Sequence, residues 1–195
     1  MSDLFKPAGE IGMNTKDLSF VIVFAVLNFM ILMIANQITN LIPITLGLSY
    51  IFTILYAINA SVAWLMYEGR RWRILAQAIV FNTLTAVFVP SSAFVLSIAG
   101  IVHAFTADLI FNSFYGYFKL KNKLVWWIIL LQVFFWATSP LWTLVFLASL
   151  VYPLENVLTL FFIPAMTIGL PIMMIEAITG GYIGYRIYLR VAKIF

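Results

Sequence analysis

Long runs of apolar residues, separated by short polar stretches, dominate this chain. A helix that crosses a bilayer needs roughly 20 mostly apolar residues. The runs approach or exceed that length, and we expect each to be a membrane-spanning helix. The predicted spans are residues 18–35, 46–67, 74–89, 93–117, 124–150 and 168–188. The pattern therefore predicts an all-α, polytopic integral membrane protein with six spans, forming a single transmembrane domain over residues 1–195.

The stretch between the fifth and sixth predicted spans, residues 152–167, is apolar but contains Pro153 and Pro164. A proline inside a helix removes a backbone hydrogen bond and kinks the helix. Irregular backbone at membrane depth is tolerated only where protein or a water-filled cavity covers it. We therefore expect a broken or interfacial segment here, and not a further span.

The basic residues predict the orientation of the spans. They fall in the N-terminal tail, the second-to-third loop, the fourth-to-fifth loop and the C-terminal end. The eleven residues are Lys6, Lys16, Arg70, Arg71, Arg73, Lys119, Lys121, Lys123, Arg186, Arg190 and Lys193. The other three loops contain no Lys or Arg. Because cytoplasmic loops are the ones enriched in Lys and Arg, we expect a multi-pass protein of the cell membrane with both termini in the cytoplasm. The first run lacks a small-residue cleavage site at its end, so we expect it to remain as a helix.

Composition supports lipid as the main solvent and argues against an enzyme. The chain is 64% hydrophobic and only 9% charged, whereas soluble domains carry about 25% charged residues. It has no cysteine and a single histidine, which argues against thiolate and multi-histidine metal sites. It contains no P-loop, no GxGxxG and no HExxH motif. We expect no catalytic residues, no metal and no cofactor. The net charge of +4 reflects the basic loops and does not indicate nucleic-acid binding.

Five polar residues lie inside the predicted spans: His103, Asp108, Asn112, Glu176 and Asn82. An ionisable residue within a span is costly and is a functional candidate by default. Asp108 and Asn112 are one helical turn apart and share a face. Each of the five either lines a cavity or ligand site, or makes a structural hydrogen bond to a neighbouring helix. Both interpretations remain open from the sequence.

Small residues form a second group, in the last predicted span. Gly180 and Gly184 make a GxxxG pattern, and Ala177 and Gly181 add a parallel pair. Such patterns let two helices approach closely. We expect these four positions to be helix-packing residues.

Two stretches carry a resemblance to a known family. One is GIVHAFTADLIF at residues 100–111, which precedes the basic loop KLKNK at residues 119–123. The other is IEAITGGYIGYRIYLR at residues 175–190. With six spans, both ends inside and no ATPase motif, the chain resembles the substrate-binding S components of energy-coupling factor (ECF) vitamin transporters.

The resemblance implies that the protein captures a vitamin-like small molecule on the outer side. It also implies protein partners, namely a transmembrane coupling subunit and two ABC ATPases. In such a site aromatic rings stack on the ligand and a few polar groups orient it. The outer-half candidates are Asn36, Gln37, Asn40, His103, Trp136, Trp142, Glu155 and Asn156, although core packing explains the two tryptophans equally well.

Two other functions remain open. The chain could be a self-contained small transporter or channel subunit, in which Asp108 and Glu176 form a proton or cation path. It could also be a membrane assembly or scaffold protein whose buried carboxylates are purely structural. The first predicts transport by the protein alone, and the second predicts stable partners without a small ligand. An intramembrane enzyme is the least favoured, because no nucleophile–base pair is evident.

Overall fold

In the computed structural model every regular element is helical, and the structure describes residues 12–41, 52–88, 93–150, 153–163 and 165–193. The long helices, in chain order, are α1 (Thr15–Leu41), α2 (Thr53–Met66), α3 (Arg73–Phe88), α4 (Ala93–Leu120), α5 (Leu124–Leu150) and α7 (Leu170–Val191). No strand occurs in these described ranges. The predicted all-α class is therefore confirmed.

The segment between α5 and α7 is broken into short pieces. It contains the four-residue helix α6 (Leu154–Val157) and the two π-helical turns η3 (Leu158–Phe162) and η4 (Ala165–Gly169). Pro153 precedes α6, and a proline lies in the first turn of α7, where its missing N–H costs nothing. Pro140 behaves differently, because it is buried inside α5 and the helix continues through it.

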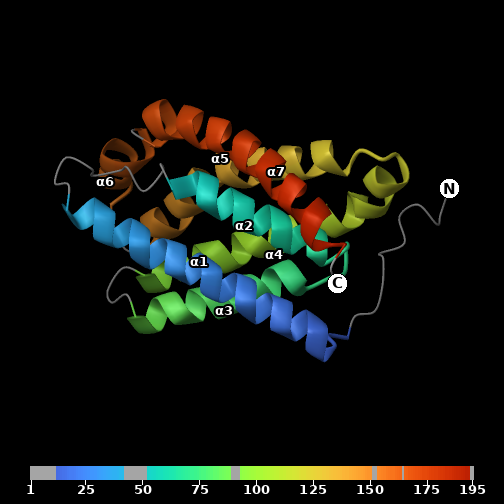
Figure 1. The fold of residues 1–195 in the computed structure, drawn as a ribbon. Helices are drawn as coiled ribbons and strands as arrows, with labels where there is room; N and C mark the ends of the chain where they lie inside the picture. Colours follow the sequence, from blue (N-terminus) through green and yellow to red (C-terminus); the bar gives the residue numbers. More distant parts are fainter. Residues whose placement is uncertain (1–11, 42–51, 89–92, 151–152, 164, 194–195) are drawn as a thin grey trace.

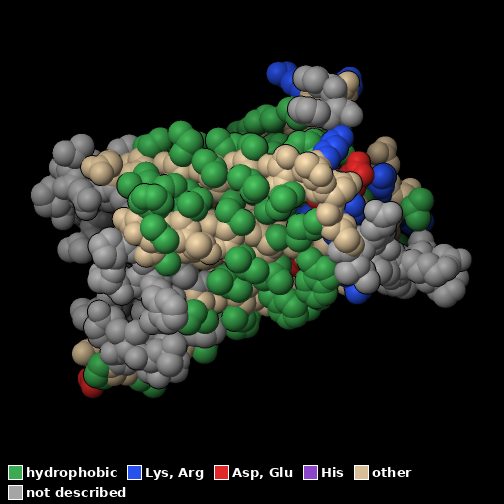
Figure 2. All heavy atoms as spheres, turned by 90° about the horizontal axis from the view of Figure 1, so that it is seen from below, with side chains coloured by type: hydrophobic (Ala, Val, Ile, Leu, Met, Phe, Trp, Pro, Cys, Tyr) green, Lys and Arg blue, Asp and Glu red, His purple; other side chains and the backbone are tan. Residues whose placement is uncertain are grey.

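Consecutive long helices run antiparallel (Figure 1). α2 packs mainly against α7, and α3 packs against α1 and α4. The start of α1, the α2–α3 turn, the α4–α5 turn and the last turn of α7 lie at one end, and α6 lies at the other (Figure 1). Lys and Arg side chains gather at the first of these ends (Figure 2). We call it the basic end.

The surface between the two ends is largely apolar. Large hydrophobic side chains are exposed along every long helix, for example Val23, Leu130 and Ile175, and they cover the body of the molecule in Figure 2. Among the residues that the structure describes, four stretches are long and apolar enough to cross a membrane: Thr15–Ala35, Ile98–Leu120, Leu124–Trp142 and Met166–Val191. Such a surface is favourable in lipid and unfavourable in water. α2 and α3 are apolar too, but shorter.

α7 packs closely against α2 and α5 through its small residues. A Cβ added at Gly184 would lie 2.6 Å from the Ser61 Cβ, and one at Gly180 would lie 2.7 Å from the Ala57 Cβ. A Cβ at Gly181 would meet α5 instead, 3.2 Å from the Cα of Ile129. Ala177 is fully buried one turn before Gly181. Glycine at these positions is what allows the backbones to approach.

Candidate functional site

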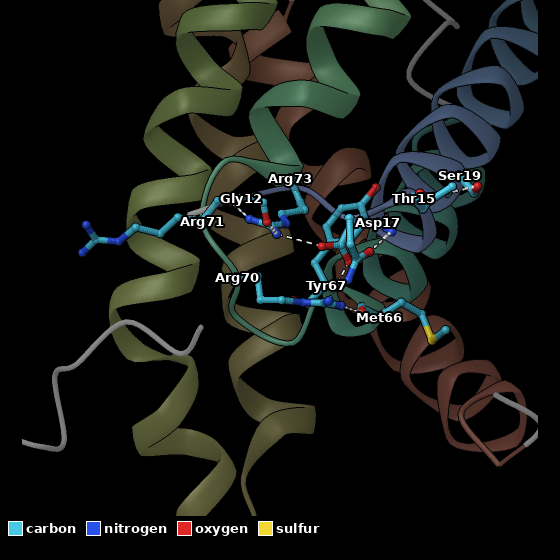
Figure 3. A network of polar contacts seen from close by, with 10 residues as sticks. Gly12, Thr15, Asp17, Ser19, Met66, Tyr67, Arg70, Arg71 and Arg73 are labelled. Atoms are coloured by element: carbon cyan, nitrogen blue, oxygen red, sulfur yellow. Dashed lines mark hydrogen bonds and ion pairs between the residues drawn. The ribbon is translucent and has the colours of Figure 1, made fainter. Parts of the chain in front are cut away.

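A buried ion-pair network ties α1 to the α2–α3 turn at the basic end (Figure 3). The Asp17 carboxylate in the first turn of α1 pairs with Arg73 at 2.7 Å and with Arg70 at 2.6 Å. Asp17 and Arg73 are each 1% exposed. Arg70 also donates to the backbone oxygens of Tyr67 and Met66. Because an unpaired buried charge is very costly, these contacts hold the start of α1 against the turn.

The α2–α3 turn has an unusual backbone. Glu68, Gly69 and Trp72 all have positive φ angles, at 54°, 74° and 71°. The left-handed conformation is uncommon for a bulky residue such as tryptophan. Gly69 also lies so close to Tyr115 on α4 that an added Cβ would be 2.6 Å from the ring. The surrounding contacts therefore determine the path of this turn.

Tyr67, directly after α2, adds a buried polar contact to the same region. Its hydroxyl donates to Gln77 Oε1 on α3 at 3.0 Å. This hydrogen bond joins the end of α2 to α3.

Asp108 on α4 caps the start of α3. Its Oδ1 accepts the backbone N–H of Trp72 at 2.9 Å, and its Oδ2 accepts those of Ile74 at 2.9 Å and Leu75 at 3.2 Å. Asn112, one turn further along α4, donates to Oδ1 at 2.6 Å. The first N–H groups of a helix have no partner within that helix and favour a negative charge. Asp108 thus accepts four hydrogen bonds, and its carboxylate lies at the α2–α3 turn.

Glu176 on α7 plays a corresponding part at the start of α2. Its carboxylate accepts hydrogen bonds from the backbone N–H groups of Thr53 and Ile54. α2 has 14 residues and is therefore about 21 Å long, whereas the hydrocarbon core of a bilayer is about 30 Å thick. One end of such a helix lies where water is scarce, so a carboxylate from a longer neighbour satisfies its N–H groups. The other oxygen, Oε2, is buried without a hydrogen-bond partner in the described part of the chain.

A cluster of rings lies between α2, α4 and α5, toward the end opposite the basic end. The His103 ring stacks on Phe135, with centroids 3.8 Å apart and planes 5° apart. Trp142 lies 6.3 Å from the His103 ring. Trp136 contacts Phe135 at 5.5 Å and Tyr56 of α2 at 5.9 Å. We call these five residues the aromatic cluster, and three of them are sequence-predicted candidates: His103, Trp136 and Trp142.

Hydrogen bonding assigns the proton on His103. The Thr138 hydroxyl donates to the Phe134 backbone oxygen at 2.8 Å, so its oxygen is an acceptor toward the histidine. This contact favours the tautomer in which His103 Nε2, 3.0 Å from Thr138 Oγ1, carries the proton and donates. In the neutral imidazole this leaves Nδ1 as an acceptor.

Gln132 supplies a second polar group beside the cluster. Its Oε1 accepts the Trp136 indole N–H at 3.2 Å. The Gln132 side chain is fully buried, and its Nε2 has no hydrogen-bond partner within the described ranges. An unpaired buried donor is costly, so the arrangement favours an added acceptor at this position.

The remaining candidates lie elsewhere. Glu155 and Asn156 are on α6, and Gln37 is near the end of α1, all three with exposed side chains. The side chains of Asn36 and Asn40 lie outside the described residues. Asn82 donates to the Ala78 backbone oxygen at 2.8 Å and packs against Gly100.

Sequence reasoning missed Asp17, Arg73, Tyr56, Phe135 and Gln132. Arg73 was assigned only to a loop and Asp17 was not singled out, and 56 positions separate them in the chain. The helical spacing of Gln132 and Trp136, four residues apart, was the one available signal that both belong to the same face.

No protein-family model, curated protein or solved structure matches the chain. Within the described residues, no three His, Cys, Asp or Glu side chains form a group that could hold a metal ion.

Proposed function

We propose that the protein is the membrane-embedded, substrate-binding S component of an ECF-type importer. In this proposal the six long helices cross the cell membrane, and the basic end with both termini faces the cytoplasm. A vitamin-like small molecule enters from the opposite side. A transmembrane coupling subunit and two ABC ATPases supply the energy. The clustering of Lys and Arg at one end of the helix bundle supports this orientation.

The observation that carries the proposal is the aromatic cluster with its polar neighbours. The cluster extends from near the middle of α5, where Phe135 and Trp136 lie, toward the opposite end of the bundle, where Tyr56 lies in the first turn of α2. Its rings offer stacking surfaces for a planar heterocycle. His103 Nδ1 offers an acceptor and Gln132 Nε2 a donor. A few convergent polar groups among aromatic side chains are what small-molecule sites typically contain.

The contacts of Asp108 weigh against a proton or cation path through Asp108 and Glu176. Asp108 accepts four hydrogen bonds, three of them from the backbone of α3 and the turn before it. A carboxylate held in this way serves as a helix cap, and losing its charge would leave those donors poorly paired. A proton or cation path through both acids is therefore disfavoured.

A self-contained transporter remains the second candidate because of Glu176. Its Oε2 has no hydrogen-bond partner among the residues that the structure describes, so this one oxygen is available to a cation. Transport by the purified protein alone in liposomes, lost in Glu176→Gln, would favour this candidate. Transport only in the presence of an ATPase module would favour the S component.

The ligand site is tested by purifying the tagged protein from its own host and identifying small molecules released on denaturation. We expect about one ligand per chain, and a loss of at least roughly tenfold in retained ligand for Trp136→Ala, since aromatic anchors carry much of the binding energy. Trp126→Phe is the matched control, because Trp126 is exposed near the basic end and its loss should leave retention unchanged.

A second readout separates loss of the site from loss of the fold. Both variants should elute as single, monodisperse species, and only Trp136→Ala should lose its ligand. The placement is wrong if a ligand is recovered equally from the wild-type protein and from correctly folded Trp136→Ala. The function itself is in question if the wild-type protein releases no small molecule.

A further inference from the structure

The α4–α5 turn presents three lysines in a fixed geometry at the basic end. Lys119, Lys121 and Lys123 are all exposed. The turn is held by backbone hydrogen bonds, including Lys121 N–H to the Tyr117 oxygen at 3.1 Å and Lys123 N–H to the Phe118 oxygen at 2.8 Å. Asn122, in the left-handed conformation with φ 55°, reverses the chain. Three positive charges are therefore held within five residues.

No ion pair among the described residues neutralises these three lysines. The ion pairs of the described residues run from Asp17 to Arg70 and Arg73, and none reaches a lysine of this turn. Asp108 is occupied by the α3 backbone. Lys119 lies 5.7 Å from the Tyr115 ring centroid, a contact that keeps its positive charge.

The apolar surface of the bundle continues up to this turn. On α5, Trp126, Leu130 and Phe134 are exposed at four-residue intervals, so they form one outward stripe. Trp126 is 64% exposed and follows Lys123 by three residues. On α4, Leu120 is 74% exposed within the turn region. Tryptophan prefers the headgroup layer of a membrane, with Lys just beyond it.

We propose that the α4–α5 turn binds the headgroups of anionic phospholipids in the adjacent leaflet. The three amines pair with phosphate groups, Trp126 lies in the interface, and Leu120 contacts the acyl region. The apolar stripe favours lipid over an acidic protein partner, because it joins Trp126 beside the turn to the exposed apolar surface of the bundle, which lipid would cover. The inference needs membrane insertion with the basic end at one surface, and it does not depend on the ligand site.

The test measures lipid contact at Trp126 in reconstituted bilayers. Its fluorescence, obtained as the difference between the wild-type protein and Trp126→Phe, is quenched by brominated phosphatidylglycerol or brominated phosphatidylcholine at equal mole fractions. We expect a preference for the anionic lipid on the order of tenfold or more at low salt, since each Lys near an anionic surface adds to binding. The preference should shrink in 0.5 M NaCl because exposed charges are screened.

The triple variant Lys119→Gln, Lys121→Gln and Lys123→Gln should lose the preference while Trp126 is still quenched. The matched control removes two exposed arginines of α7, Arg186→Gln and Arg190→Gln, and should keep the preference at Trp126. Equal quenching by both lipids in the wild-type protein would overturn the proposal. An absence of quenching by either lipid would also overturn it, and would place the turn in water or against a protein.

Discussion

Replacing Asp108 with alanine tests whether this residue acts as a helix cap. The substitution removes the acceptor for the backbone N–H groups of Trp72, Ile74 and Leu75 and for the Asn112 amide. Losing a capping acceptor costs about 0.5–2 kcal/mol, and each buried donor left without a partner costs about 1–3 kcal/mol. Partial relaxation of the turn recovers some of this, so we expect a total loss of about 3–5 kcal/mol.

The assay is the thermal midpoint of unfolding of the purified protein in detergent. A chain of this size loses roughly 2–4 °C per kcal/mol, so Asp108→Ala should lower the midpoint by roughly 10 °C. Asp108→Asn keeps one of the two acceptor oxygens and should lose about half as much stability. Ser113→Ala is the control, because the Ser113 side chain is exposed on the same helix and its hydroxyl donates to the Leu109 backbone oxygen within that helix.

Two results would refute this reasoning. One is an Asp108→Ala protein as stable as Ser113→Ala, which would mean that the contacts to α3 contribute nothing. The other is an Asp108→Asn protein of full stability that has lost transport, which would make the carboxylate functional and not structural.

Three further predictions concern packing and charge. Gly184→Ala should destabilise the protein by about 1–3 kcal/mol in the same assay, because the new Cβ meets Ser61 and overpacking costs about this much. Gly12→Ala should be neutral, because a Cβ there meets nothing within 4 Å. Equal effects of the two substitutions would contradict the close packing at Gly184. Asp17→Ala should lower the stability by about 3–5 kcal/mol, because it leaves the Arg73 charge buried without its partner. The double variant Asp17→Leu with Arg73→Met should recover most of that loss. A double variant as unstable as Asp17→Ala would argue against the ion pair as the cause. Glu176→Gln keeps one acceptor for the α2 N–H groups and should cost only about 0.5–1 kcal/mol, whereas a loss above 3 kcal/mol would show that the charge itself is needed.

The helices could be predicted because each depends on a local property, a run of apolar residues. The predicted third span, residues 74–89, and the helix α3 (Arg73–Phe88) differ by one residue at each end. α2 begins at Thr53, seven residues after the predicted start, and residues 46–51 lie outside the described part. The broken segment before α7 could also be anticipated, because proline acts locally.

The roles of the polar residues could not be predicted in the same way, because they depend on contacts between distant parts of the chain. Asp108 was considered as a cavity-lining group or as a partner of a neighbouring helix. Its partners are backbone N–H groups 33–36 positions earlier, which carry no side-chain signal. Similarly, nothing in the sequence indicates that Glu176 meets the first turn of α2. His103 and Trp136 were named as candidates from the sequence, but Tyr56, which contacts Trp136, could not be linked to them.

The most direct test of the proposed function is to identify the proteins that remain bound to the tagged chain. The chain is solubilised from membranes of its own host in a detergent that preserves complexes, and its partners are identified by mass spectrometry. We expect two ABC-type ATPases and one other membrane subunit in stoichiometric amounts. Purification without any ATPase, together with transport by the protein alone in liposomes, would contradict it.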